Sequence, residues 1–350
     1  MTNTNEPSTE NGDCIYRIGL TMAGAISAGA YTAGVFDYLI SALSQWEKAK
    51  ASPTEEQPNA KFQPQIVAIS GASAGGMTAV LGTIALGRTL IPTNKKTTSG
   101  GDINCVLPEL YSAWVEKVRM VSDIGPSFLS NEDVEGKVDN KVRSLLNASL
   151  LDQICESALR VPTPPPQVAP YAFLAEPLHV YVTLTNLDGV EYYISFANEK
   201  YRMLNHGDRK HFTITGIGKD CGAASAWAKS DPTRLPLSVA QLNQAGAASS
   251  GWQAMGQAAL ATGAFPIGLA ARVLPADTAD YMDRKWPLPT VNANPINPTW
   301  PDGWAQEGKQ FHFVAVDGGA IDNEPFELAR YAIKNDNADN ARDAERADRS

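Results

Sequence analysis

Two stretches near the N-terminus share one pattern: a short apolar run, a loop of small residues, and apolar residues at helical spacing. The run YRIGLT, residues 16–21, predicts a strand, and the loop MAGAISAGAY follows it. Beyond this loop Val35, Leu39, Leu43 and Trp46 recur three or four residues apart, and Phe36 and Tyr38 widen the apolar stripe. This spacing predicts a helix with one apolar face.

The same pattern begins again at residue 65. QIVAIS, residues 65–70, is a continuous apolar run of the kind found in buried parallel strands. A glycine-rich turn, residues 71–76, follows it. The next predicted helix has four apolar residues on one face: Met77, Val80, Leu81 and Ile84. Two such units in succession predict an α/β fold with a largely parallel sheet, in which sites lie beyond the carboxyl ends of the strands.

Later elements are less regular. Residues 107–121 and 137–160 predict helices, and residues 177–197 predict two strands joined by a hairpin at Asp188-Gly189. QAALATGAFPIGL, residues 257–269, predicts a helix that is stopped by Gly263 and Pro266. A further buried-type strand, FHFVAV, runs directly into Asp317-Gly318-Gly319, and a helix is predicted after it.

These elements predict one domain over residues 14–334. A short polar leader, residues 1–13, precedes it, and a charged tail, residues 335–350, follows it. Proline-rich composition predicts loop-rich insertions near residues 160–177 and 275–310.

Composition and charge indicate which binding partners and which cellular compartment to expect. The chain of 350 residues has a formal net charge of -9, which argues against nucleic acid as a partner. The four cysteines are widely spaced and the leader is not a signal peptide, so we expect a cytoplasmic protein. Residues 18–36 and 65–87 lack charge, but small residues interrupt both, which favours buried strand–turn–helix units over membrane spans. Peripheral contact with a membrane remains compatible with the sequence.

One turn carries a candidate nucleophile. Gly71-Ala72-Ser73-Ala74-Gly75 is a G-x-S-x-G pattern between a predicted strand and a predicted helix. In many serine hydrolases this pattern forms a sharp turn that exposes the serine hydroxyl. The alternative is a small residue in a tight glycine turn.

A serine nucleophile needs a base, and the histidines are poorly placed to supply one. None of the four follows Asp317 in the chain. His179 and His312 lie in predicted strands, where a structural role is common. His206 and His211 flank the charged segment NHGDRK and are expected at the surface.

Asp317 is the better candidate base. It follows a buried strand directly, and the two glycines after it allow a tight turn. A carboxylate at the carboxyl edge of the sheet could reach Ser73 and accept its proton. The alternative is an Asx turn or a helix cap.

The loop from Gly24 to Gly29 is a candidate oxyanion hole. It follows the first predicted strand, and acyl transfer needs backbone N–H donors in a rigid loop. It does not match G-x-G-x-x-G, so nucleotide binding is not predicted. No cluster of side chains has metal-ligand spacing, so neither a metal nor a cofactor is expected.

Together, a glycine loop after the first strand, G-x-S-x-G after the next and Asp-Gly-Gly after a late strand resemble the patatin-like phospholipase family. Residues 261–269, ATGAFPIGL, and 182–189, VTLTNLDG, are similar to two further stretches of that family. The resemblance implies a three-layer α/β/α fold with a mainly parallel sheet. It also implies a Ser73–Asp317 dyad that cleaves lipid or phospholipid acyl esters through an acyl-enzyme.

The resemblance implies roles for neighbouring residues too. Oxyanion donors fall on Gly24, Ala25, Ile26 and Ala74, and supporting glycines are Gly29, Gly71, Gly75 and Gly318. The family loop G-G-G-x-R-G is matched here only by its first and last glycines. Ala25 and Ile26 would be strained there if their φ were positive. Two alternatives stay open: a non-lipid esterase or thioesterase with the same dyad, and a catalytically weak protein that binds lipid or a partner.

Overall fold

The computed structural model describes most of the domain predicted from the sequence. The predicted leader, residues 1–13, and tail, residues 335–350, lie outside the described residues. The residues described are 14–25, 29–52, 62–90, 92–96, 100, 102–123, 125–133, 141–197, 199–220, 224–231, 233–282, 284, 296–300 and 309–333. Among these residues, no helix combines the length and the apolar character that crossing a bilayer requires.

Strands and helices alternate at the start of the chain, as the pattern predicts. The strands are β1 (Cys14–Met22), β2 (Phe62–Gly71), β3 (Thr93–Lys96), β4 (Asp102–Cys105), β5 (Tyr171–Phe196), β6 (Glu199–Thr215), β7 (Gly218–Lys219), β8 (Arg234–Ser238), β9 (Arg272–Asp277) and β10 (Gln310–Asp317). The α-helices are α1 (Gly29–Ala51), α2 (Ala74–Leu86), α3 (Pro108–Tyr111), α4 (Ser149–Leu159), α5 (Ala226–Lys229), α6 (Val239–Leu242), α7 (Ser250–Thr262) and α9 (Phe326–Ile333). A π-helical turn, η1 (Ser112–Lys117), extends α3, and two short 3₁₀ turns are η2 (Thr278–Tyr281) and η3 (Gly318–Ala320).

The long strand β5 organises the sheet. β6 pairs with it on one side, antiparallel, over the whole stretch from Leu178 to Thr185. On the other side β2 runs parallel to β5 and ends with Gly71 beside Val182. On that same side β10 runs antiparallel to β5 and ends with Asp317 beside Leu184. The carboxyl ends of β2 and β10 therefore meet alongside β5.

Most of the remaining pairings are parallel. β1 pairs with β2, β7 with β5 and β8 with β6 in parallel, whereas β9 pairs with β10 antiparallel. Of the seven pairings between described strands of this sheet, four are thus parallel. The predicted α/β fold with a mainly parallel sheet is confirmed.

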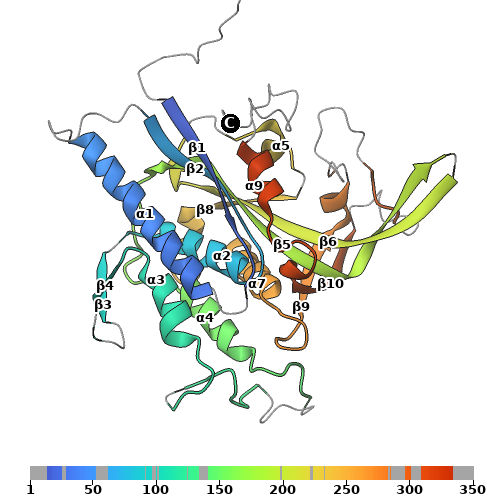
Figure 1. Cartoon of the computed structure of the whole chain (residues 1–350), viewed down its shortest axis with the longest axis horizontal. Coiled ribbons are helices and arrows are strands. Elements are labelled where there is room, and N and C mark those ends of the chain that lie inside the picture. Colours follow the sequence, from blue (N-terminus) through green and yellow to red (C-terminus); the bar gives the residue numbers. More distant parts are fainter. Residues whose placement is uncertain are drawn as a thin grey trace, which may run out of the picture.

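Helices cover both faces of the sheet (Figure 1). On one face α1, α2, α4 and α7 bury a large apolar core against β2 and β5, with Phe36, Ile69 and Trp252 at its centre. On the other face α5 and α9 pack over Val67 and Tyr181. The arrangement is compatible with a three-layer α/β/α architecture.

The buried face of α1 agrees only in part with the predicted one. Of the predicted residues, Phe36 and Leu43 are buried, whereas Val35 and Tyr38 are exposed. Gly82 of α2 explains why Phe36 is at the centre of the buried face, because a side chain at position 82 would overlap the Phe36 ring. The missing side chain lets Phe36 pack directly against α2.

The predicted hairpin at Asp188-Gly189 is wrong, because β5 continues through it. The Asn186 side chain accepts hydrogen bonds from the N–H groups of Asp188 and Gly189, both at 3.0 Å. Gly189 takes a positive φ of 70° and the register to β6 shifts there, so the pair forms a bulge within the strand. Residues 141–148, predicted as helix, are also irregular before α4, and β5 begins within the predicted insertion at 160–177.

Candidate active site

Ser73 lies at the sharp turn between β2 and α2. Its backbone has φ 51° and ψ −127°, a conformation rare for a residue with a side chain. Two glycines allow the turn: a side chain on Gly71 would overlap the Gly75 backbone, and one on Gly75 would overlap the Met22 carbonyl oxygen. The turn therefore has the strain and the tight packing expected of a nucleophile elbow.

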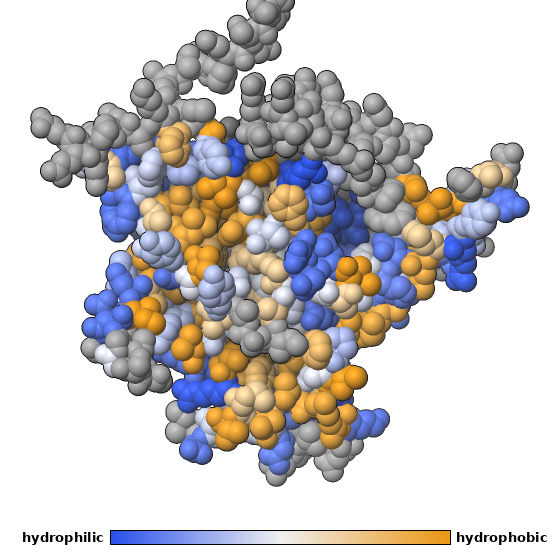
Figure 2. All heavy atoms as spheres, viewed as in Figure 1, coloured by the Kyte–Doolittle hydropathy of each residue, from blue (hydrophilic) through white to orange (hydrophobic). Residues whose placement is uncertain are grey.

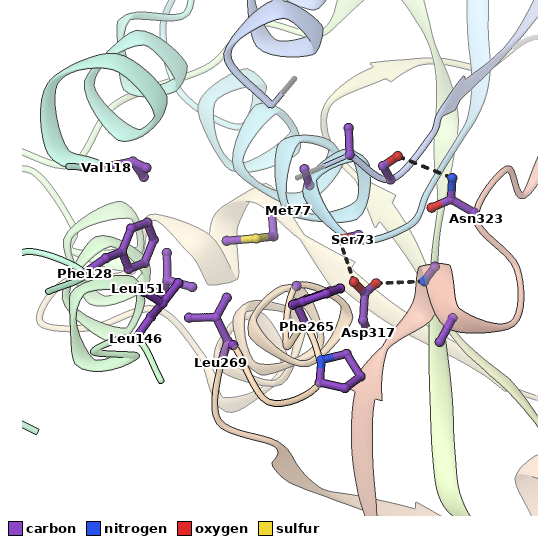
Figure 3. A pocket seen from close by; sticks show the side chains of 18 of the residues that line it. Ser73, Met77, Val118, Phe128, Leu146, Leu151, Phe265, Leu269, Asp317 and Asn323 are labelled. Carbon is purple, nitrogen blue, oxygen red and sulfur yellow. Dashed lines mark hydrogen bonds between the residues drawn. The ribbon is translucent and has the colours of Figure 1, made fainter. Parts of the chain in front are cut away.

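Asp317 lies at the end of β10 and faces Ser73. The Ser73 hydroxyl donates to Oδ2 of Asp317 at 3.0 Å, while the Gly319 N–H donates to Oδ1 at 2.8 Å (Figure 3). The carboxylate thus makes the Asx-type turn contact with one oxygen and contacts the candidate nucleophile with the other. Gly318 is needed for this turn, because a side chain there would overlap the Thr183 carbonyl.

Burial changes the basicity of this carboxylate. Asp317 is only 7% exposed, and burial raises its pKa above the ordinary value of 3.8. Hydrogen bonds from Gly319 and Ser73 lower the pKa by a smaller amount. A carboxylate with a raised pKa accepts a proton from a hydroxyl more readily, so the environment of Asp317 suits a general base.

The predicted oxyanion loop is close to Ser73 but offers fewer donors than expected. Gly24 donates its N–H to the Asn323 carbonyl at 3.0 Å, and the Asn323 side chain donates back to the Gly24 carbonyl at 3.3 Å. The Gly24 N–H is therefore engaged. Ala25 lines the cavity beside Ser73 and is not among the described residues with positive φ, so the strain considered for it does not arise.

Ala74, another predicted donor, is the first residue of α2, so its N–H has no acceptor within the helix. Ile26 lies outside the described residues. Gly29, at the start of α1, packs against the Trp114 ring so closely that a side chain would overlap it.

Two polar contacts of the site were not predicted from the sequence. Thr262, the last residue of α7, accepts a hydrogen bond from the Ser73 N–H on its Oγ1 at 2.8 Å. Asn323 holds the Gly24 loop in place as described above. Thr262 lies in the segment 261–269 that carries the family resemblance and precedes Gly263, which was the available signal, whereas Asn323 stands between two acidic residues and gave no signal.

An apolar cavity of about 430 Å³ opens directly at Ser73 and Asp317. Figure 3 shows apolar side chains extending from the dyad along one side of the cavity. They come from α2, from the segments between α3 and α4, from α4 itself, and from the loop after α7. The labelled apolar residues are Met77, Val118, Phe128, Leu146, Leu151, Phe265 and Leu269.

The histidines lie away from this cavity, since none of its described lining residues is a histidine. His211, predicted at the surface, is wholly buried because NHGDRK is part of strand β6 and not a turn. Its Nδ1 lies 3.2 Å from Asp231 and its Nε2 lies 2.9 Å from His179. Burial and the neighbouring His211 lower the pKa of His179 to about 3. This cluster lies under α5, in the layer opposite the cavity.

The described part of the chain contains no group of three or more His, Cys, Asp or Glu side chains placed to hold a metal ion. Cys155 is a free thiol.

The chain is similar to a known protein whose function is not established. No model of a protein family matches the chain. It is 41% identical, over 353 aligned residues, to the uncharacterized protein y4iI of Sinorhizobium fredii. The alignment covers 98% of this chain and 49% of that protein, so the chain spans about half the length of this relative.

Proposed function

We propose that this chain is a serine acyl hydrolase of the patatin-like type, a phospholipase A or related lipid acyl hydrolase. The observation that carries the proposal is the 3.0 Å hydrogen bond from Ser73 to Asp317 at the opening of an apolar cavity. The strained backbone of Ser73 and the raised pKa of Asp317 support it, because each is costly to the fold and useful to catalysis.

Acylation follows from the position of the two side chains. Ser73 Oγ attacks the ester carbonyl carbon while its proton passes to Asp317 Oδ2. The N–H groups of Ala25 and Ala74 are the donors available for the negative oxygen of the tetrahedral intermediate. When this intermediate collapses, the carbon–oxygen bond to the alcohol breaks, and the alcohol leaves with the proton held by Asp317.

Deacylation repeats these steps with water. Asp317 takes a proton from a water molecule while the oxygen of that water attacks the carbonyl carbon of the acyl-enzyme. The second tetrahedral intermediate breaks its bond to Ser73 Oγ, which regains the proton. The carboxylic acid is released and the dyad returns to its starting state.

The cavity lining favours a lipid ester over a small soluble one. Apart from the dyad and Asn323, the lining side chains are apolar, and burying each CH₂ group of an acyl chain contributes about 0.8 kcal/mol. A long chain therefore gains binding energy that an acetyl or butyryl group lacks. Phospholipids and neutral acyl esters both satisfy this requirement.

Fluorophosphonate labelling of the purified chain tests the proposal. We expect Ser73→Ala and Asp317→Asn to abolish labelling and hydrolysis of a soluble nitrophenyl ester. Asp322→Asn is the matched control, because Asp322 lies in the same turn and burial also raises its pKa, but its carboxylate makes no hydrogen bond to Ser73. A folded wild-type chain that neither labels nor hydrolyses any ester would favour a lipid- or partner-binding protein. Hydrolysis restricted to short acyl chains or thioesters would favour a non-lipid esterase or thioesterase.

A further inference from the structure

Large apolar side chains are exposed beside the cavity. Phe265 and Leu129 are 50% and 60% exposed, and Leu145 and Ile267 are 74% and 77% exposed. Together with Met120 we call these residues the apolar rim. Figure 2 shows apolar side chains gathered at the lower end of the view, over the loops around α4. Monomeric proteins rarely expose such a group of side chains unless it binds something.

Backbone hydrogen bonds hold the apolar rim together. Leu129 N–H donates to the Met120 carbonyl at 3.0 Å, and Leu145 N–H donates to the Ile267 carbonyl at 2.9 Å. The Asn147 N–H donates to the Phe128 carbonyl at 2.9 Å and so joins the two pairs into one surface. The rim does not depend on a single mobile side chain.

The apolar rim is continuous with the cavity wall. Phe128 and Leu146 line the cavity, and each is the chain neighbour of an exposed rim residue, Leu129 and Leu145 respectively. Phe265 belongs to both, since it lines the cavity and is half exposed. An acyl chain could move from the rim into the cavity along apolar surface throughout.

Ile267 carries a second unfavourable feature. Its φ is 70°, a region that β-branched residues rarely occupy. The fold thus holds a large apolar side chain in strained backbone and directs it to solvent. Neither feature serves the core, which indicates that the exposed side chain has a partner.

We infer that the apolar rim docks this chain on the surface of a lipid bilayer, so that an acyl chain enters the cavity directly from the lipid. The inference rests on the proposed function, because the continuous apolar path from rim to Ser73 is what favours lipid over a protein partner. Docking by apolar side chains that insert at the level of the headgroups is a general mode of peripheral membrane binding.

Vesicle flotation of the full chain carrying Ser73→Ala tests the inference without turnover. We expect this chain to float with phosphatidylcholine vesicles, also at high salt. Leu145→Ser or Ile267→Ser, added singly, should each weaken vesicle binding about tenfold, as loss of roughly half the burial energy of one such side chain predicts. Tyr16→Ser is the matched control: Tyr16 is 64% exposed but lies at the start of β1, the end of that strand far from Ser73.

Rates on a soluble nitrophenyl ester, measured with Ser73 intact, separate the two proposals. The rim variants should keep the wild-type rate, which also shows that they fold. Flotation that depends on the rim, without hydrolysis of any ester, would overturn the proposed function and leave docking standing. Hydrolysis of the soluble ester without flotation would overturn docking alone. Docking would also be overturned if the rim variants converted a dimer to a monomer and left vesicle binding unchanged, since the rim would then join two copies.

Discussion

The hydrogen bond from the Ser73 N–H to Thr262 offers the sharpest test of how the fold prepares its nucleophile. Thr262 is wholly buried and is the last residue of α7, so the core fixes its hydroxyl in place. Thr262→Val removes the acceptor and keeps a branched side chain of nearly the same shape. The Ser73 N–H then lacks its partner at the residue whose backbone is already strained.

The expected loss follows from the cost of an unpaired donor. Leaving a buried N–H without its acceptor costs about 1–3 kcal/mol. If all of this appears at the transition state, kcat falls by about 5- to 150-fold. KM should change little, because Thr262 is not among the residues that line the cavity. The loss should therefore lie in kcat and in the rate of fluorophosphonate labelling.

Thr262→Ser is the matched control. It keeps the hydroxyl and loses a methyl group that packs closely against Gly76. We expect it to lower the melting temperature and to keep most of the wild-type kcat, the opposite pattern to Thr262→Val. If Thr262→Val labels and hydrolyses at the wild-type rate, the hydrogen bond does not position Ser73. If both variants lose activity equally, packing of α7 and not the hydroxyl is responsible.

Three further predictions concern the dyad, the elbow and the buried cluster. When kcat/KM on a soluble ester is plotted against pH, its fall on the acid side should have a midpoint above pH 3.8, because the base must be ionised and burial raises the pKa of Asp317 from 3.8. A midpoint at or below pH 3.8 would contradict this reasoning. Gly75→Ala should destabilise the chain by about 1–3 kcal/mol in urea unfolding, because its methyl group overlaps the Met22 carbonyl, whereas Gly34→Ala in open space on α1 should stabilise it slightly. The free energy of unfolding should fall as the pH drops from 6.5 toward 3, and His179 should contribute at most about 1.4 kcal/mol per pH unit. The reason is that His179 takes up a proton readily in the unfolded chain, whereas in the folded chain its pKa is about 3. Stability that does not change over this pH range would contradict that pKa.

The candidate dyad could be predicted because its signals are local. Asp317 follows an apolar strand directly, Ser73 follows one after Gly71 and Ala72, and each has nearby glycines that a tight turn requires. The partners of the dyad gave weaker signals. Thr262 and Asn323 matter only because α7 and the turn after η3 pack against the elbow, and one sequence does not reveal such long-range contacts.

The errors in the fold have the same origin. Asp188-Gly189 is a strong hairpin signal, but Asn186 accepts the N–H bonds of both residues and β6 pairs with β5 on either side of them. Pairing of β5 with β6 therefore makes this turn sequence a bulge within a continuous strand. His211 was misplaced in the same way, because a polar segment within a strand still buries alternate side chains.

The sheet itself sets the distance between nucleophile and base. β2 and β10 approach each other along one side of β5 and end beside Val182 and Leu184, two residues apart, which is about 7 Å of strand. A slip of β10 by one residue would turn the Asp317 side chain to the opposite face of the sheet and separate it from Ser73. The Thr185 hydroxyl, which donates to the Asp317 carbonyl at 2.8 Å, helps to fix this register. The two residues of the dyad, 244 positions apart in the chain, are thus brought together by a third strand that contributes neither of them.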